Sequence, residues 1–488
     1  MTTETLILLG VGLYMTIMAV IGFVASRGSH SLTDFVVAGR NMPLWLCSVS
    51  IFATWFGSGI MMGAATSAYK GDMIEIVAEP FGSGLALLLS GLFFAKLYRR
   101  TKRLTWPEFF EARYGTLASA VASIADAIAN IIWLGGMLFT FGVLLNSFTG
   151  TSMGVGIFGG LFVIVLYTMI GGMWAVALTD FIQMIVFVVG MFALLFFVLG
   201  DAGGWGEVVA QLPEHSFRLY PLEHTFNNWV EYIHVWMGLG VAAVASSSII
   251  QRALSARSEN VAKNSFYLAA LGYMTVGIVP LLLGFAATVT MPDLEDPDAV
   301  LSLLAIEHLH PVFAAIFVGA IVSAIMSSSD SILLGVSSII SMNLLPRVIK
   351  NPSDELRLRV ARYSIPVCGL IATYVAFNAD GVIDVLQNSV EVLLAAIIVP
   401  FILCFWWEKA NRLGALAGIF SGLIVWLFAP RIGIEFPADF LGFFVSATSM
   451  LVVTLLTQKI DPPKPLTDID GNPVELVDRV GTLGLRKS

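Results

Sequence analysis

Charged residues are scarce in this sequence. Only 12% of its 488 residues are Asp, Glu, Lys or Arg, whereas 57% are hydrophobic. Soluble domains carry about 25% charged residues, so this composition excludes an ordinary soluble domain. Apolar runs long enough to cross a bilayer recur along the whole chain, without the alternation that a β-barrel requires. The sequence therefore predicts an all-α polytopic membrane protein.

Cysteine is also rare, and no long basic run is present. Cys47, Cys368 and Cys404 lie far apart in apolar segments, which excludes a disulfide framework and a cysteine metal cluster. Without a basic run, we expect no nucleic-acid partner. The sequence has no His-Glu-x-x-His motif, no Gly-x-Ser-x-Gly elbow and no Cys/His pairing, so we do not expect an enzyme.

The apolar runs divide into about thirteen predicted spanning segments of about 20 residues or more. They lie at residues 5–26, 44–69, 76–98, 116–148, 152–171, 173–200, 228–251, 265–291, 311–346, 360–379, 384–407, 412–430 and 437–458. The first segment follows Glu4 rather than a basic patch, so we interpret it as a retained helix and not a signal peptide. With the N-terminus outside and the C-terminus inside, only Lys70, Arg218 and Arg431 fall in outer loops, as the positive-inside rule requires.

A serine-rich cluster interrupts the apolar segment 311–346. On a helix Ala324, Ser327, Ser328 and Ser331 share one stripe, and Asp330 lies beside it. Hydroxyl and carboxylate oxygens are hard ligands, so the stripe predicts a site for a small hard cation. The alternative is that the serines bond back to their own helix or join neighbouring helices.

Two other segments carry glycine pairs and hydroxyls that favour an unwound backbone. These are Ala53–Gly63 in the second segment, and Gly238 to Ser248 in the seventh. Unwound backbone at membrane depth is tolerated where it lines a cavity. Because the two segments are five helices apart, they indicate inverted repeats with a solute site between them. The alternative is close helix packing through small residues.

Two carboxylates and two indoles are the remaining candidates for a buried site. Asp180 lies within the sixth segment. Because no basic residue lies in the apolar part of any predicted segment, the expected partner of Asp180 is a bound cation or a proton, in a site that it could share with Asp330. Glu79 is a candidate for the cavity, whereas Glu75 fits a solvated helix end. Trp55 and Trp133 are placed to line a cavity for a cationic or apolar ligand, or else to pack as core.

With these residues in view, residues 5–458 resemble the sodium:solute symporter family. Three motifs carry the resemblance: Ala53-Thr-Trp-Phe-Gly-Ser-Gly59, Gly171-Gly-Met-Trp-Ala-Val-Ala-Leu-Thr-Asp180 and Ser323-Ala-Ile-Met-Ser-Ser328. The resemblance implies a LeuT-like 5+5 inverted repeat. It divides the chain into an extra helix and loop (1–43), a first repeat (44–200), an extracellular loop (201–227), a second repeat (228–410), two C-terminal helices (411–458) and a cytoplasmic tail (459–488).

The resemblance also implies two ion sites. The main sodium site would use the carbonyls of Ala53, Phe56 and Ala324 and the hydroxyls of Ser327 and Ser328. A second site, for sodium or a proton, would use Asp180, Ser327, Asp330 and Ser331. Asp330 departs from the all-hydroxyl pattern of many family members.

For the solute, the motifs are closest to the choline-transporting branch. That branch has Trp at the positions of Trp55 and Trp133, whereas the proline-transporting branch has Asp at the position of Trp55. Ser246 stands where the choline branch has a further Trp, and Glu79 would balance an ammonium group. We therefore predict that Trp55, Trp133, Glu79 and Ser246 bind the solute.

The expected function is a sodium-coupled symporter of the plasma membrane that imports choline or another small organic cation or zwitterion by alternating access, with Na+ as the coupling ion. A proton-coupled symporter is the nearest alternative. A sodium symporter for proline or another small metabolite, a solute channel and a transporter-like sensor are further alternatives.

Overall fold

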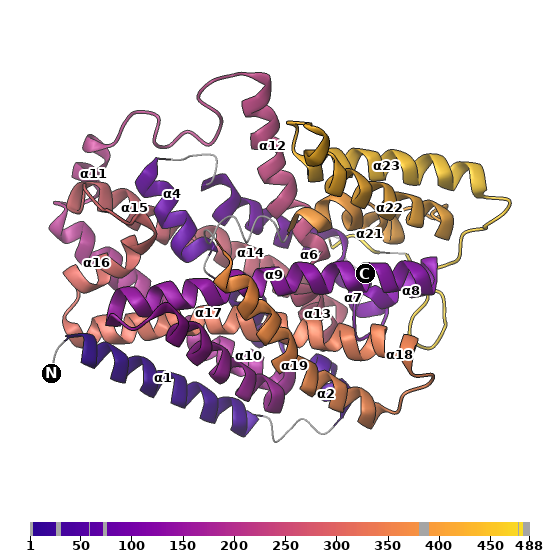
Figure 1. Cartoon of the computed structure of the whole chain (residues 1–488), viewed down its shortest axis with the longest axis horizontal. Helices are drawn as coiled ribbons and strands as arrows, with labels where there is room; N and C mark the ends of the chain where they lie inside the picture. The colour runs from indigo at the N-terminus through magenta and orange to yellow at the C-terminus, as the bar shows by residue number, and fades with distance from the viewer. Residues whose placement is uncertain are drawn as a thin grey trace.

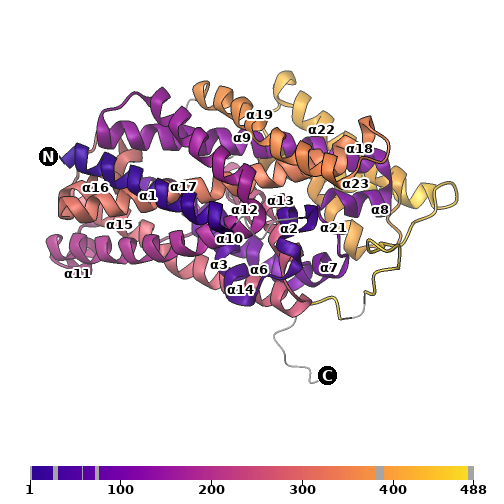
Figure 2. The ribbon, with the colours of Figure 1, turned by 90° about the horizontal axis from the view of Figure 1, so that it is seen from below.

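The computed structural model of the chain describes residues 3–25, 31–57, 59–71, 76–379, 390–476 and 478–481. In these ranges the structure is helical, with two isolated β-bridges and no β-strand. The longest helices run side by side along the long axis of the molecule, and α22 and α23 form a pair at one end (Figure 1). The view from below shows the same arrangement (Figure 2).

The helix bounds agree closely with the predicted segments. The helices of the described ranges are α1 (Thr3–Ala25), α2 (Leu32–Val37), α3 (Leu44–Trp55), α4 (Ala64–Lys70), α6 (Ser83–Phe93), α7 (Ala95–Arg100), α8 (Pro107–Tyr114), α9 (Thr116–Thr149), α10 (Met153–Asp201), α11 (Trp205–Gln211), α12 (Phe226–Gly240), α13 (Ser247–Ser255), α14 (Glu259–Val276), α15 (Ile278–Thr290), α16 (Val300–His308), α17 (Pro311–Ile339), α18 (Leu345–Val348), α19 (Asp354–Phe377), α21 (Ile398–Trp406), α22 (Arg412–Phe428) and α23 (Ala438–Thr457).

Large apolar side chains cover much of the outer surface. Leu13 on α1 is 65% exposed, Phe162 and Phe196 on α10 are 64% and 75% exposed, and Tyr374 on α19 is 72% exposed. Soluble proteins rarely expose apolar surface on this scale, so these side chains face lipid. This agrees with a multi-pass membrane protein.

Both segments predicted to be unwound are broken helices. The second segment consists of two helical parts. The first is α3, and the second is a π-helical turn (Gly59–Gly63) that continues into α4; the axes of the two parts differ by 67°. The seventh is divided at Ser246 between a 3₁₀ turn (Ala242–Ala245) and α13, with a bend of 42°. The two breaks predicted from glycine pairs and hydroxyls are therefore confirmed.

The division between the fifth and sixth segments lies at Gly172. Helix α10 has 49 residues, which at 1.5 Å per residue far exceeds the thickness of a bilayer. Gly172 breaks it with φ 60° and ψ −162°, in a region that favours glycine. A Cβ there would come within 2.8 Å of the Phe35 carbonyl oxygen, so α2 packs directly against the kink.

Short helices occupy connections for which the sequence analysis predicted no helix. Helix α8 lies between the third and fourth segments, and α11 and α16 lie in the long loops. Seven described helices are long and apolar enough to cross a membrane, or nine if each bent pair is one span. The count of about thirteen, the orientation of the termini and the division into repeats stay predictions.

Helix α17 lies at the centre of the bundle. It packs against α1, α9, α10 and α19, and it also touches α3 and α13. Its middle is almost completely buried, including Ser327, Ser328, Asp330 and Ser331. The serine-rich stripe therefore faces protein and not lipid.

Candidate functional site

The break in the second segment faces the serine stripe of α17. The Ser328 hydroxyl lies 3.5 Å from the Ala53 carbonyl oxygen and 3.5 Å from the Ala324 carbonyl oxygen. Both distances are at the outer limit of a hydrogen bond, so the hydroxyl is only weakly engaged. Three of the five residues predicted to ligate sodium at the main site, Ala53, Ala324 and Ser328, thus have their oxygen atoms close together.

The backbone at the break leaves the Ala53 carbonyl without its helical partner. In a continuous helix the Gly57 N–H would donate to Ala53, but here it donates to the Trp55 carbonyl at 2.7 Å. Gly57 also permits the close approach, because a Cβ there would lie 2.8 Å from the Ser328 hydroxyl oxygen. The freed carbonyl suits a hard cation.

Phe56 and Ser327 are the other two residues predicted for the main sodium site. Phe56 ends α3 with ψ of 63°, so its carbonyl no longer points along the helix. The Ser327 hydroxyl donates to Oδ1 of Asp180 and does not point at the Ala53 carbonyl. Ser327 therefore links the main site to the predicted second site.

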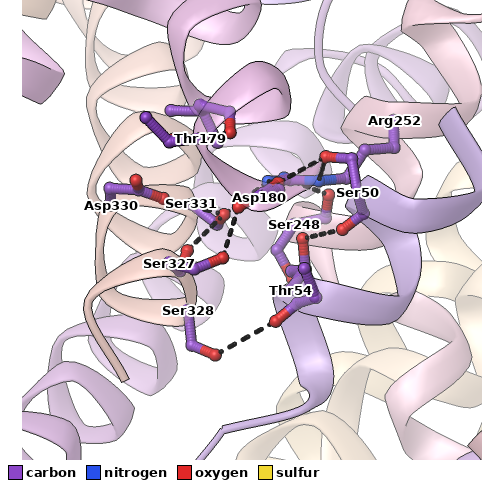
Figure 3. A network of polar contacts seen from close by, with 12 residues as sticks. Ser50, Thr54, Thr179, Asp180, Ser248, Arg252, Ser327, Ser328, Asp330 and Ser331 are labelled. Atoms are coloured by element: carbon purple, nitrogen blue, oxygen red, sulfur yellow. Dashed lines mark hydrogen bonds and ion pairs between the residues drawn. The ribbon is translucent and has the colours of Figure 1, made fainter. Parts of the chain in front are cut away.

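Asp180 lies at the centre of a buried polar network (Figure 3). Its Oδ1 accepts from Ser327, and its Oδ2 accepts from the Ser50 hydroxyl at 2.6 Å. The Arg252 guanidinium lies 3.7 Å from the same Oδ2. The carboxylate is thus held by three different helices besides its own.

Arg252 corrects the sequence analysis, which found no basic residue in the apolar part of any segment. The side chain is completely buried on α13 and reaches three oxygens besides Asp180. It donates to the Ser248 carbonyl at 2.9 Å, to the Ser50 hydroxyl at 3.1 Å and to the Ser331 hydroxyl. Because the seventh segment unwinds and then continues beyond residue 251, Arg252 lies within the bundle and not in a loop. Asp180 therefore has an internal cation as its partner.

Asp330 has separate partners from Asp180. Its Oδ2 accepts from the Tyr167 hydroxyl at 2.7 Å, and its Oδ1 accepts from Ser331 at 3.1 Å. Ser331 also donates to the Ser327 carbonyl at 2.7 Å. The two carboxylates therefore belong to one network, but they are joined through Ser331 and Arg252 and do not face one another across an open ion site.

A cavity lies on the other side of the break in the second segment. All four residues predicted to bind the solute line it: Trp55, Trp133, Glu79 and Ser246. About 590 Å³ in and around it is not filled by atoms. The remaining lining residues were not predicted to bind the solute: Thr54, Ser83, Ala129, Asn130, Leu239, Ala243, Ser248, Ile332, Val390 and Leu393.

Glu79 is the charged side chain among the described lining residues. It is 9% exposed; Oε1 accepts from the Ser83 hydroxyl at 2.9 Å, whereas the buried Oε2 has no hydrogen-bond partner in the described part of the chain. A buried carboxylate oxygen without a partner is costly. The cavity therefore offers an unsatisfied acceptor to a cationic ligand.

Several site residues were missed because their signals are tertiary. Ser50 lies one turn before Ala53 in an ordinary helical stretch, and Tyr167 precedes the Gly172 break. The sequence around each of these two residues looks the same as that of an ordinary helix packed in a bundle. Arg252 had a detectable signal, because it is an isolated cation directly after an apolar and hydroxyl-rich segment.

Comparison with known proteins identifies the family of this chain. Residues 35–422 match the family model described as sodium:solute symporter family. The human high affinity choline transporter 1 is 28% identical over 80% of this chain and 70% of its own length. The high-affinity proline transporter PutP of Bacillus subtilis is 25% identical over 92% of this chain and 98% of its own.

The fold is also shared with a solved transporter. A Na+-coupled sialic acid symporter in a substrate-bound, outward-open state superposes with a TM-score of 0.80, at 21% identity, over 94% of this chain and 99% of that chain. The all-helical fold is thus that of LeuT-like transporters. The broken helices, the buried serine stripe and the family match over residues 35–422 together lead to one conclusion: this chain is a multi-pass membrane transporter that belongs to the sodium:solute symporter family.

Proposed function

We propose that this protein is a sodium-coupled symporter that imports choline or a closely related small organic cation by alternating access. One observation carries the proposal: the same helix break contributes to both sites. Trp55 lines the cavity, while the neighbouring Ala53 carbonyl and Gly57 face Ser328 on α17. An ion bound at the break therefore acts on the solute cavity directly.

Coupling follows from this shared element. A sodium ion between Ala53, Ala324 and Ser328 would hold α3 against α17 and fix the backbone on which Trp55 stands. The solute then meets a preorganised cavity, and linkage requires that the solute raise sodium affinity by the same factor. Movement of one bundle against the other would release both on the opposite side.

The lining of the cavity favours an organic cation over a zwitterion. Glu79 supplies a negative charge, and Trp55 and Trp133 supply indole rings that attract cations. The described lining residues include no Lys, Arg or His to receive a carboxylate. This also disfavours proline, in addition to the presence of Trp55 at the position where the proline branch has Asp.

Proton coupling is the second candidate, because Asp180 and Asp330 are buried carboxylates. The Arg252 guanidinium beside Asp180 makes this less favourable, since an ion pair leaves that carboxylate no need for a proton. A proton-driven transporter would accumulate choline in sodium-free buffer when the pH outside is lower than inside.

The solute is tested by thermal stability of the purified protein with choline or betaine, each with and without sodium. Both ligands have a trimethylammonium group, but choline carries a hydroxyl group where betaine carries a carboxylate. We expect choline to raise the melting temperature only with sodium, and betaine to raise it much less. Equal stabilisation by both ligands would reject the assignment of an organic cation.

The ion site is tested by the double variant Ser327→Ala/Ser328→Ala. We expect the sodium concentration for half-maximal choline binding to rise by about tenfold or more, within the usual range of coupling energies. Ser329→Ala is the matched control, because Ser329 donates to the Ile325 carbonyl of its own helix at 2.8 Å. Wild-type sodium dependence in the double variant would refute the main site.

The role of Glu79 is tested by Glu79→Gln, which keeps the shape of the side chain and removes its charge. We expect choline affinity to fall by about tenfold or more, as for other buried charge partners. Glu391→Gln is the control, because Glu391 accepts from the Trp426 indole outside the cavity. An unchanged choline affinity in Glu79→Gln would remove Glu79 from the site.

A further inference from the structure

A third buried carboxylate lies close to the solute cavity and has no role in the sites described above. Asp126 is completely buried on α9, one helical turn before Asn130. Both of its carboxylate oxygens lack a hydrogen-bond partner in the described ranges. Ser247, Trp106 and Asn130 are the polar side chains that face it. These neutral groups lie too far away for good hydrogen bonds and leave the negative charge of the carboxylate uncompensated, so the site requires a proton, a cation or another compensating group.

Two of the residues that face Asp126, namely Trp106 and Ser247, also line a second, smaller compartment beside it. Trp106, Ser247, Gln251 and Gly335 are among its lining residues, and about 200 Å³ in and around it is not filled by atoms. A Cβ on Gly335 would lie 3.3 Å from the Ser247 hydroxyl oxygen and 3.9 Å from Oε1 of Gln251. Both oxygens therefore approach the compartment where the glycine leaves room.

The Gln251 amide is oriented so that its oxygen remains available. Its Nε2 donates to the Val36 carbonyl at 2.7 Å and to the Ser338 hydroxyl at 3.2 Å. Its Oε1 is a buried acceptor with no partner among the residues that the structure describes. Carbonyl, hydroxyl and carboxylate oxygens around a small space are the donor set of a hard monovalent cation.

A hydrogen bond joins a residue that lines this compartment to a residue that lines the solute cavity. The Asn130 amide donates to the Ser247 hydroxyl at 3.2 Å and to the Asp126 carbonyl at 2.8 Å. Asn130 lines the central cavity, and Ser247 lines the second compartment. The second compartment lies toward the start of α9 and toward α8, the side that the basic loops predict to be cytoplasmic.

We propose that Asp126 and its compartment form a second cation station, which receives a monovalent cation leaving the central cavity toward the cytoplasm. The cation is either the released sodium ion or the ammonium head of the solute, since both carry one positive charge. When the hydrogen bond between Asn130 and Ser247 breaks, the cation can pass from the central cavity into the second compartment. The oxygens of Asp126, Ser247 and Gln251 then replace some of the ligands that the cation loses on leaving the central cavity. This inference rests on the proposed function.

The test compares binding with exchange in Asp126→Asn, in the full chain reconstituted into liposomes. Choline–choline exchange and sodium–sodium exchange are measured with radiolabelled choline and sodium, and choline binding is measured by thermal shift. We expect exchange of at least one cation to slow by about tenfold, the effect of raising one barrier by about 1.4 kcal/mol, while choline binding changes less than about twofold. Slowing of choline exchange alone identifies the ammonium head, and slowing of sodium exchange identifies the ion.

Wild-type rates for both exchanges in Asp126→Asn would overturn the station. Absence of any sodium-linked stabilisation of the wild type by choline would instead reject the proposed function, so the two failures are distinct. If Asp126→Asn does not fold, the wild type is imaged in an inward-open state with sodium and choline. Density beside Asp126 and Gln251 is then expected, and an empty compartment would overturn the station.

Discussion

Among single residues, Arg252 changes the interpretation of the predicted second ion site most. Its guanidinium lies 3.7 Å from the Asp180 carboxylate, and both side chains are completely buried. A buried ion pair is held by mutual attraction against a large desolvation cost, so each partner depends on the other. Arg252 is thus a fixed internal cation for Asp180, and Ser327 connects this ion pair to the proposed main sodium site.

Removing one partner of this pair leaves the other charge buried alone. We expect Arg252→Met to destabilise the protein by about 3–5 kcal/mol, whereas Arg252→Met/Asp180→Asn recovers most of that loss. Unfolding in detergent by heat or denaturant measures both. Equal losses in the single and double variants would show that the charges are not coupled.

A second prediction at this scale concerns Gly57. A Cβ there would come within 2.8 Å of the Ser328 hydroxyl oxygen, so Gly57→Ala pushes the break away from α17. We expect sodium affinity to fall by about tenfold, within the range of coupling energies between linked sites, with little loss of folded protein.

The control for this change is Gly63→Ala in the same broken segment. A Cβ on Gly63 meets nothing within 4 Å, and Gly63 has an ordinary helical φ of −57°. Sodium titration of choline binding compares the two variants. Similar titrations for both would mean that the break does not approach Ser328 in the sodium-bound state.

At the scale of helices, the discontinuities arrange the site. The breaks at Trp55–Gly57 and at Ser246 free backbone groups and open the cavity, and the kink at Gly172 ends one segment of α10 and starts the next. Unwound backbone is stable in these places because protein surrounds it. The sequence signals for all three were glycines and hydroxyls inside apolar runs.

Gly172 provides a test of one discontinuity. Gly172 combines φ 60° with ψ −162°, a region that essentially only glycine adopts, so alanine there costs about 1–3 kcal/mol. The alanine Cβ would also lie 2.8 Å from the Phe35 carbonyl oxygen. We expect Gly172→Ala to lower the melting temperature and the yield of folded protein. Gly159→Ala on the same helix, where a Cβ meets nothing within 4 Å, should leave both unchanged. Equal behaviour of the two variants would argue against the kink.

At the scale of the whole molecule, the C-terminal segment folds back onto the basic connection between α7 and α8. Lys96 contacts Asp478 at 2.5 Å, Lys102 contacts Asp470 at 3.2 Å, and the Ile469 N–H donates to the Thr101 carbonyl at 3.0 Å. The tail and this connection therefore lie on the same face, as the predicted orientation requires for two cytoplasmic segments.

Cysteine labelling tests that orientation. The three native cysteines are buried, so single cysteines at the exposed positions Glu214 and Lys464 report on opposite faces. We expect Glu214→Cys to react with a membrane-impermeant maleimide in intact cells, and Lys464→Cys to react only after permeabilisation. The reverse pattern would invert the topology, and labelling of both in intact cells would contradict the odd number of spans.

The sequence by itself determined the membrane class, the broken helices, the serine-rich stripe of α17 and three of the residues that line the cavity, namely Trp55, Trp133 and Glu79. These follow from local patterns: apolar length, glycine and hydroxyl clusters within it, and helical spacing on α17. Only the tertiary structure decided the partners of the buried carboxylates. Arg252 reaches Asp180 from a helix 72 positions further along the chain, and Asp126 faces Ser247 across the bundle. Pairing between distant helices depends on their packing, and no local pattern of residues encodes that packing.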